Sequence, residues 1–299
     1  MLSKLIGGAA LWVALCGGVV AADFTFGALG DTPYTWFEET HFPGMLEEIS
    51  REDLAFVVHV GDFKAQRAPC SDELFRQRRK WFDSVRHPFV FVPGDNEWTD
   101  CRGFQAGGYD PLERLAKLRE LFSGSEESLG QRRIRLARQS PDYPEHARWR
   151  HGDALFVTLN VPGHDNNARR MPEEFRSRSA AVGEWLEQSF SLARGDRLRA
   201  VVIFMQANPW ISPTGRYFGF RELLATMAKE TLGFDGEVLL VHGDTHRFRV
   251  DSPLHDPATG ALIANFTRVE VFGSPGMNWV RIRVSDQGGR TSFEITPGN

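Results

Sequence analysis

Acidic side chains follow apolar runs at several places in this sequence, and a glycine comes directly before each acid. Glycine permits the sharp turn that lifts the next side chain above the end of such a run. Amide and imidazole groups occur at the ends of the same or similar runs. The side chains concerned are Asp31, Asp62, Asp95, Asn96, Gln206, His242, Asp244 and His246. One Gly-Asp pair is ordinary turn chemistry, but the whole set of oxygen and nitrogen ligands is typical of a divalent metal site.

The elements that must position these side chains are the runs themselves. Continuous apolar runs predict strands that are buried on both faces. They cover residues 24–30, 54–60, 88–92, 199–205 and 237–241. Helical patterns separate them, at residues 43–50, 71–85, 110–122, 173–193 and 220–232. Because ligands of open α/β sheets bind beyond the carboxyl ends of the strands, we expect these polar side chains to meet at one edge.

The remaining segments complete the predicted fold. Residues 148–161 predict a hairpin, and the polar, arginine-rich stretch 124–145 indicates an insertion. Alternation with period two predicts antiparallel sheet over residues 266–295. Successive strand–helix units favour an α/β fold of two stacked sheets flanked by helices, in a single domain that covers residues 23–299.

Composition excludes several classes of protein. Of 299 residues, 41% are hydrophobic and 25% are charged, which is typical of globular proteins and unlike disordered, collagen-like or multi-span membrane chains. The formal net charge is -4, and without a basic stripe we expect no nucleic acid as a specific partner. The oligomeric state is not readable from the sequence.

The first 22 residues have the pattern of a secretory signal peptide. Lys4 precedes an apolar stretch, and small residues follow at 20–22. The alternative is a retained membrane anchor, but the stretch is short and glycine-interrupted compared with the about 20 residues that a span needs. A lipoprotein signal at Cys16 is a weaker alternative, because Leu15 precedes it. We therefore expect an exported protein, periplasmic or secreted, with no membrane span after cleavage.

Three cysteines are present, and the first of them lies in the signal segment. Cys70 and Cys101 remain, and an even pair in an oxidising compartment predicts a disulfide. The bond would close a loop of about 30 residues and stabilise the fold by about 3 kcal/mol in the chain-entropy model. The alternative is two separate buried thiols.

The order of these motifs resembles that of the calcineurin-like metallophosphoesterases, over about residues 28–246. The family pattern is D-x-H, G-D, G-N-H-[DE], a lone His and G-H-x-H. The matching segments here are GD at 30–31, GDFK at 61–64, PGDNE at 93–97, Gln206 and GDTH at 243–246. The resemblance implies a four-layer α-β-β-α sandwich of two mixed sheets, a dinuclear metal centre, and hydrolysis of phosphate mono- or diesters.

The sequence departs from the family at several ligand positions. Asp31, Asp62 and His246 match, and the resemblance assigns them to the first metal, with Asp62 bridging. The family's other histidine and asparagine positions carry Pro33, Asp95, Asn96, Gln206 and Asp244. The resemblance then implies a second site of Asp62, Asp95 (or Asn96 if the register slips by one), Gln206 and Asp244. Oxygen ligands favour Mn, Mg or Ca over Zn, in one or two ions; a ferric ion at Tyr34 is a further option.

The resemblance also places catalytic groups. A metal-activated hydroxide near Asp62 would attack phosphorus. Asn96 stands where the family has a histidine that assists the leaving group, and an amide can donate a hydrogen bond but cannot deliver a proton. His164 and His242 are the candidates to replace it, although His164 could equally be an ordinary loop histidine. The predicted contacts to substrate are Lys64, Asn160, Asn167 and Asn208.

Two functions follow from the sequence. The first is an exported metal-dependent phosphoesterase that acts on a small phosphate ester. The alternative is a non-catalytic binding or scaffold protein that has kept the fold and lost much of its metal chemistry. The replaced ligands are mostly other groups able to bind a metal, and this favours the enzyme.

Overall fold

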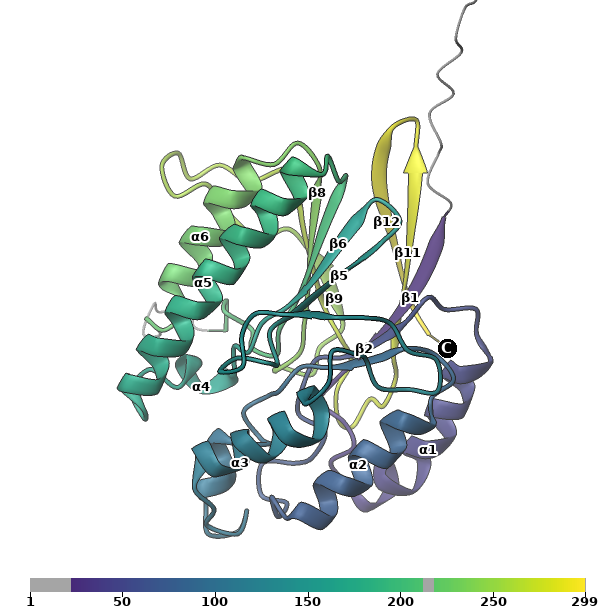
Figure 1. Ribbon diagram of the computed structural model, residues 1–299, viewed down its shortest axis with the longest axis vertical. Helices are drawn as coiled ribbons and strands as arrows, with labels where there is room; N and C mark the ends of the chain where they lie inside the picture. Colours follow the sequence, from purple (N-terminus) through teal and green to yellow (C-terminus); the bar gives the residue numbers. More distant parts are fainter. Residues whose placement is uncertain (1–22, 212–217, 299) are drawn as a thin grey trace, which may run out of the picture.

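Two β-sheets lie face to face in this protein, and helices cover the outer face of each (Figure 1). The computed structural model describes residues 23–211 and 218–298, so the predicted signal segment 1–22 lies outside the described residues. The four-layer order of helices, sheet, sheet and helices confirms the α-β-β-α sandwich that the motifs imply.

The first sheet has the strand order β12-β11-β1-β2-β3. Its strands are β1 (Phe24–Leu29), β2 (Val57–His59), β3 (Phe89–Phe91), β11 (Val280–Gln287) and β12 (Arg290–Pro297). Strands β1, β2 and β3 run parallel, and the last residues Leu29, His59 and Phe91 are paired across them. This register brings the segments that follow the three strands to the same edge of the sheet.

The second sheet has the strand order β4-β5-β6-β7-β8-β10-β9. Its strands are β4 (Ala137–Arg138), β5 (Ala147–His151), β6 (Ala154–Thr158), β7 (Ala200–Phe204), β8 (Glu237–His242), β9 (Arg249–Asp251) and β10 (Phe266–Glu270). Strands β6, β7, β8 and β10 are parallel. β5 and β6 form the expected hairpin.

Helices α1 (Trp36–Arg51), α2 (Asp72–Ser84) and α3 (Pro111–Leu118) cover the first sheet, and α5 (Pro172–Gly195) and α6 (Arg221–Leu232) cover the second (Figure 1). Short helical turns are η1 (Thr99–Arg102), η2 (Arg119–Ser123) and α4 (Gly163–Asn166). Among the described residues, no helix has the length and apolar character to cross a membrane.

Three hydrophobic layers hold the sandwich together. The central layer joins the two sheets through side chains such as Phe26 and Phe56 from the first and Phe156 and Phe204 from the second. Each outer layer joins one sheet to its helices. Burying one such aromatic or aliphatic side chain stabilises the folded state by about 1.5–3 kcal/mol, so these layers fix the two sheets and their strand ends relative to each other.

Two sequence expectations about elements are wrong. The helical pattern predicts the first helix at residues 43–50, but α1 begins at Trp36 and contains Pro43. The side chain of Thr35 caps the helix by accepting a hydrogen bond from the Glu38 backbone N–H at 3.2 Å. In turn, the Glu38 carboxylate accepts a hydrogen bond from the Thr35 backbone N–H at 2.9 Å. The tail is not one antiparallel unit, because β10 joins the second sheet in parallel with β8. Period two identifies a strand but not its partner.

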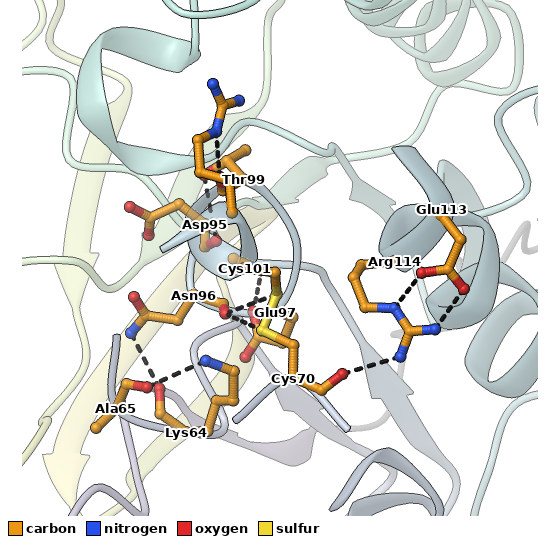
Figure 2. Close-up of a disulfide and its surroundings, with 12 residues drawn as sticks. Lys64, Ala65, Cys70, Asp95, Asn96, Glu97, Thr99, Cys101, Glu113 and Arg114 are labelled. Atoms are coloured by element: carbon orange, nitrogen blue, oxygen red, sulfur yellow. Dashed lines mark hydrogen bonds and ion pairs between the residues drawn. A yellow bond between two sulfur atoms is a disulfide. The ribbon is translucent and has the colours of Figure 1, made fainter. Parts of the chain in front are cut away.

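The predicted disulfide between Cys70 and Cys101 is present, with Cα atoms 5.7 Å apart. Both cysteines are buried between the first sheet and its helices. The sulfurs lie 3.5 and 3.6 Å from the backbone carbonyl oxygen of Asn96, while the side chains of Asp95 and Asn96 point away from the bond (Figure 2). The bond therefore braces the segment that follows β3.

Replacing both cysteines, Cys70→Ser with Cys101→Ser, should lower the free energy of unfolding by about 3–4 kcal/mol, because the bond closes a loop with a sequence separation of 31. Denaturant unfolding of the oxidised protein and of the double variant measures the difference. Added reductant should destabilise the wild type and leave the double variant unchanged. Equal stability of the oxidised protein and the double variant would contradict a stabilising bond.

Candidate metal centre

Four residues at the strand ends have a left-handed backbone. Their φ angles are 52° at Asp31, 59° at Asp62, 84° at Asp244 and 57° at His246. This conformation costs about 1–2 kcal/mol for a residue with a side chain, and residues held in it cluster at functional sites. Here it turns the side chains that follow β1, β2 and β8 toward a common region between the two sheets.

Close backbone approach explains two of the preceding glycines. A Cβ on Gly94 would lie 2.0 Å from Oδ1 of Asp62, and a Cβ on Gly243 would lie 2.0 Å from Oδ2 of Asp31. Any other residue at either position would displace the neighbouring carboxylate. Each of these glycines therefore precedes the acid of its own motif and also leaves room for the carboxylate of another Gly-Asp motif.

The first group of ligands consists of Asp31 and His246. The carboxylate of Asp31 accepts hydrogen bonds from the Asp244 backbone N–H at 3.1 and 3.0 Å. Nε2 of His246 lies 3.6 Å from Oδ1 of Asp31, and Nδ1 lies 2.8 Å from the carbonyl oxygen of Ser274. Because that carbonyl can only accept, Nδ1 donates to it, and Nε2 is the ring nitrogen that faces Asp31. Metal-binding histidines are commonly held in this way.

Asp62 is fixed from three sides. Its Oδ1 accepts from the backbone N–H of Asn96 at 3.0 Å. Its Oδ2 accepts from the hydroxyl of Tyr34 at 3.1 Å and from the amide of Gln206 at 3.3 Å. The amide of Asn96 in turn donates to the hydroxyl oxygen of Tyr34 at 2.9 Å. These bonds connect the ends of β2, β3 and β7 through one carboxylate.

Asp95 and Asp244 form the second group, together with His164. Oδ2 of Asp95 lies 2.9 Å from Nδ1 of His164. Oδ2 of Asp244 accepts from the backbone N–H of Asn208 at 2.9 Å. A Cβ on Gly163 would lie 3.0 Å from Oδ2 of Asp95 and 3.2 Å from Oδ1 of Asp244, so both carboxylates border the same point.

The electrostatics of the site are unfavourable without a cation. Burial, with the neighbouring Asp244, raises the pKa of Asp31 well above its usual value, and burial with Asp95 does the same to the pKa of Asp62. Burial and then Asp95 raise the pKa of Asp244 to about 7. Several carboxyl groups that resist ionisation in one small region fit a divalent ion, whose charge would reverse this effect.

Gln206 lies among the predicted ligands, but hydrogen bonds engage both ends of its amide. Oε1 accepts from the Gly163 N–H at 2.7 Å, and the amide nitrogen donates to Asp62. Both ends of the Gln206 amide are therefore engaged by neighbouring groups in this structure. Asp31, Asp62, Asp95 and Asp244 lie near enough to influence one another's ionisation, and His246 lies beside Asp31.

Five of the predicted catalytic or substrate-binding side chains contact other groups within the protein. His242 is buried, its Nδ1 lies 2.8 Å from the Gly243 carbonyl, and burial lowers its pKa to about 3, so it is no proton donor. Lys64 is fully buried and donates to the carbonyl of Ala65 at 3.1 Å. Asn160 is buried and donates to Glu145 at 2.9 Å.

Asn167 and Asn208 also bond within the protein. The Asn167 amide donates to Glu174 at 3.3 Å. The Asn208 amide donates to Thr245 at 3.3 Å and to Glu270 at 3.4 Å. Through its backbone N–H, Asn208 also holds the carboxylate of Asp244. A sequence pattern predicts which side chains follow a strand, but not the direction in which each of them points.

Two functional side chains had no such role in the sequence interpretation. The hydroxyl of Tyr34 holds Asp62, and burial raises the pKa of Tyr34 well above its usual value, which keeps it a neutral donor. Glu97 is buried and accepts from the backbone N–H of Phe63 and, at 2.9 Å, of Gly94. Burial raises the pKa of Glu97 to about 7. The signal for Glu97 was its match to the acidic position of the PGDNE segment.

Solved structures with a similar fold include two that are described as phosphatases. A dimetal phosphatase from Danio rerio matches 92% of this chain and 96% of its own, with a TM-score of 0.55 and 13% identity. PhoD matches 90% of this chain and 65% of its own, with a TM-score of 0.57 and 13% identity. A purple acid phosphatase from yellow lupin (Lupinus luteus) seeds matches 93% of this chain and 52% of its own, with a TM-score of 0.55 and 10% identity.

No protein-family model and no curated protein matches the sequence. At such low identity the structural matches establish the fold and nothing finer. The chain has the fold of the calcineurin-like metallophosphoesterases, as its motifs imply.

The raised pKa values predict how stability depends on pH. An acid with a raised pKa in the folded state makes folding less favourable as the pH rises from about 4 to the folded value. For Asp244, whose pKa rises from 3.8 to about 7, the loss is about 4 kcal/mol. Metal-free protein should therefore lose stability between about pH 4 and about pH 7, and saturating Mn²⁺ should remove much of that loss.

Thermal unfolding over this pH range, in chelator and in Mn²⁺, measures the effect. Asp244→Asn should flatten the pH dependence of the metal-free protein, while Asp153→Asn, in an exposed turn between β5 and β6, should not. A metal-free wild type whose pH dependence matches that of Asp244→Asn would refute the electrostatic account.

Proposed function

We propose that this protein is a metal-dependent phosphoesterase that hydrolyses a small phosphate mono- or diester. The observation that carries the proposal is the convergence of Asp31, Asp62, Asp95 and Asp244 beside an oriented His246, at the strand ends of both sheets. The fold neighbours support it, because they include a dimetal phosphatase and a purple acid phosphatase.

The residues divide between two ions. Asp31, Asp62 and His246 would hold the first, and Asp62, Asp95 and Asp244 would hold the second. Carboxylates with few imidazoles favour Mn²⁺, Mg²⁺ or Ca²⁺ over Zn²⁺. When bound, such ions polarise phosphoryl oxygens and lower the pKa of water from 15.7 toward about 7.

The chain's own groups set the geometry for this chemistry. Tyr34, Gln206 and the Asn96 backbone hold Asp62 in one orientation. Asn96 and His242 cannot protonate a leaving group. Esters with acidic leaving groups, such as aryl phosphates, depend least on a proton donor, so we expect them to react fastest. The negative net charge of the protein does not attract a phosphate. Attraction of a phosphate to the site therefore has to come from positive charge at the site itself.

We also propose that the protein is exported. The signal-like pattern of residues 1–22 supports this, and so does the disulfide, which is typical of oxidising compartments.

Asp62→Asn should lower turnover of an aryl phosphate by at least about 100-fold, because it removes the carboxylate shared by the two predicted ion sites. Initial rates with mono- and diester substrates, in Mn²⁺, Mg²⁺, Ca²⁺ or Zn²⁺, measure this, and chelator should abolish the activity. Asp153→Asn makes the same chemical change in an exposed turn and should leave the rate unchanged.

Unchanged turnover in Asp62→Asn would show that the site is wrong. A wild type that binds metal but turns over neither ester class with any of the four ions would favour the alternative, a non-catalytic binding or scaffold protein.

A further inference from the structure

The turn that carries His164 has an unusual backbone. Four consecutive residues, 164–167, have φ angles of 48°, 61°, 54° and 61°. None of them is glycine, and L-residues with side chains visit this region singly rather than in runs. Such a run persists only where its surroundings determine it, and an observed run of this kind suggests a function.

Contacts from three directions hold the turn in place. The Gly163 N–H donates to Oε1 of Gln206 at 2.7 Å. Oδ1 of Asp165 accepts from the Gly219 N–H at 2.8 Å. The guanidinium of Arg178, which is almost fully buried, donates to Oδ1 of Asn166 at 2.6 Å. The turn is therefore fixed to β7, to α5 and to the segment before α6.

The turn delivers one imidazole to the site. Residues 165–167 are buried, whereas the His164 side chain is 45% exposed. Its Nδ1 lies 2.9 Å from Oδ2 of Asp95. Gly163, next to it, approaches so closely that a Cβ would lie 3.0 Å from Oδ2 of Asp95 and 3.2 Å from Oδ1 of Asp244. Asp95 thus contacts the His164 imidazole directly, and Gly163 of the same turn lies against both Asp95 and Asp244.

A third carboxylate lies nearby but is already paired. Asp95, Asp100 and His164 each offer a ligand atom within 4.8 Å of the others. The two oxygens of Asp100, however, accept from Arg170 and from Gln66, both at 2.6 Å. We therefore leave Asp100 out of the ligand set.

We propose that His164 is a ligand of the second metal ion, bound through Nδ1 beside Asp95 and Asp244, and that Gln206 positions the turn that delivers it. The inference rests on the proposed function, because it requires an ion at Asp95 and Asp244. Gln206 occupies the position of an expected imidazole ligand, and both ends of its amide are engaged. The imidazole missing from β7 is supplied by the loop after the neighbouring strand β6.

The assignment changes the expected metal. With His246 in the first site and His164 in the second, each ion has one nitrogen ligand. Imidazole suits transition metals, whereas Mg²⁺ and Ca²⁺ prefer oxygen alone. The structure therefore favours Mn²⁺ within the group of ions that the carboxylates allow.

The test measures metal binding and not activity. Metal-stripped full-length protein is titrated with Mn²⁺ by calorimetry, and the loaded protein is examined by pulsed EPR for coupling to imidazole nitrogen. His164→Ala should weaken one of two Mn²⁺ sites by about 10- to 100-fold and remove about half of the nitrogen coupling. Mg²⁺ binding should change much less.

Three further variants sharpen the result. His164→Asn keeps a residue that tolerates the left-handed backbone, so it should fold as the wild type does and still lose the nitrogen coupling. Gln206→Ala should weaken the same Mn²⁺ site by releasing the turn. His255→Ala removes an exposed histidine whose Nδ1 lies 3.0 Å from the Pro253 carbonyl, and it should change nothing.

The outcomes separate the two levels of inference. If the wild type binds Mn²⁺ at two sites and both His164 variants keep the same affinities and nitrogen coupling, His164 is no ligand, while the metal centre stands. If the wild type binds no Mn²⁺, the metal centre and this assignment both fail.

Discussion

Asp31, Asp62, Asp95 and Asp244 gather negative charge in a region that is largely closed to water, and the rest of the structure depends on how this repulsion is managed. The hydrophobic layers hold the two sheets rigidly, so the carboxylates cannot move apart. Backbone N–H groups of Asn96, Asp244 and Asn208 each donate to one of them. These hydrogen bonds offset only part of the free-energy cost of burying several carboxylates together. The raised pKa of Asp244 reflects the part of that cost that they do not offset.

Much of this arrangement was predictable, because it follows from local patterns. Apolar runs that end in Gly-Asp identified β1, β2, β3 and β8, and the disulfide followed from the even pair of cysteines. Side-chain direction was not predictable in the same way. Lys64 and Asn160 follow strands at the expected edge, yet each is buried, because burial depends on which other segments pack over the strand end. The parallel pairing of β10 with β8 was missed for the same reason.

The roles of Gln206 and Tyr34 show how a site tolerates exchanged residues. Gln206 bonds to both the turn at Gly163 and the carboxylate of Asp62. Tyr34 bonds to Asp62 and accepts from Asn96. A position that would carry a ligand can instead carry a residue that orients ligands from other strands. A motif comparison, which counts ligands position by position, does not detect such a transfer.

The disulfide has a consequence for the order of assembly. It joins Cys70 to Cys101 on either side of the segment that bears Asp95, and its sulfurs contact the carbonyl of the adjacent Asn96. While the thiols are reduced, that segment has more conformational freedom, and binding an ion would require ordering it at the same time. Oxidation removes this freedom in advance. Cross-linking before metal loading would therefore lower the entropy cost of binding an ion at this segment.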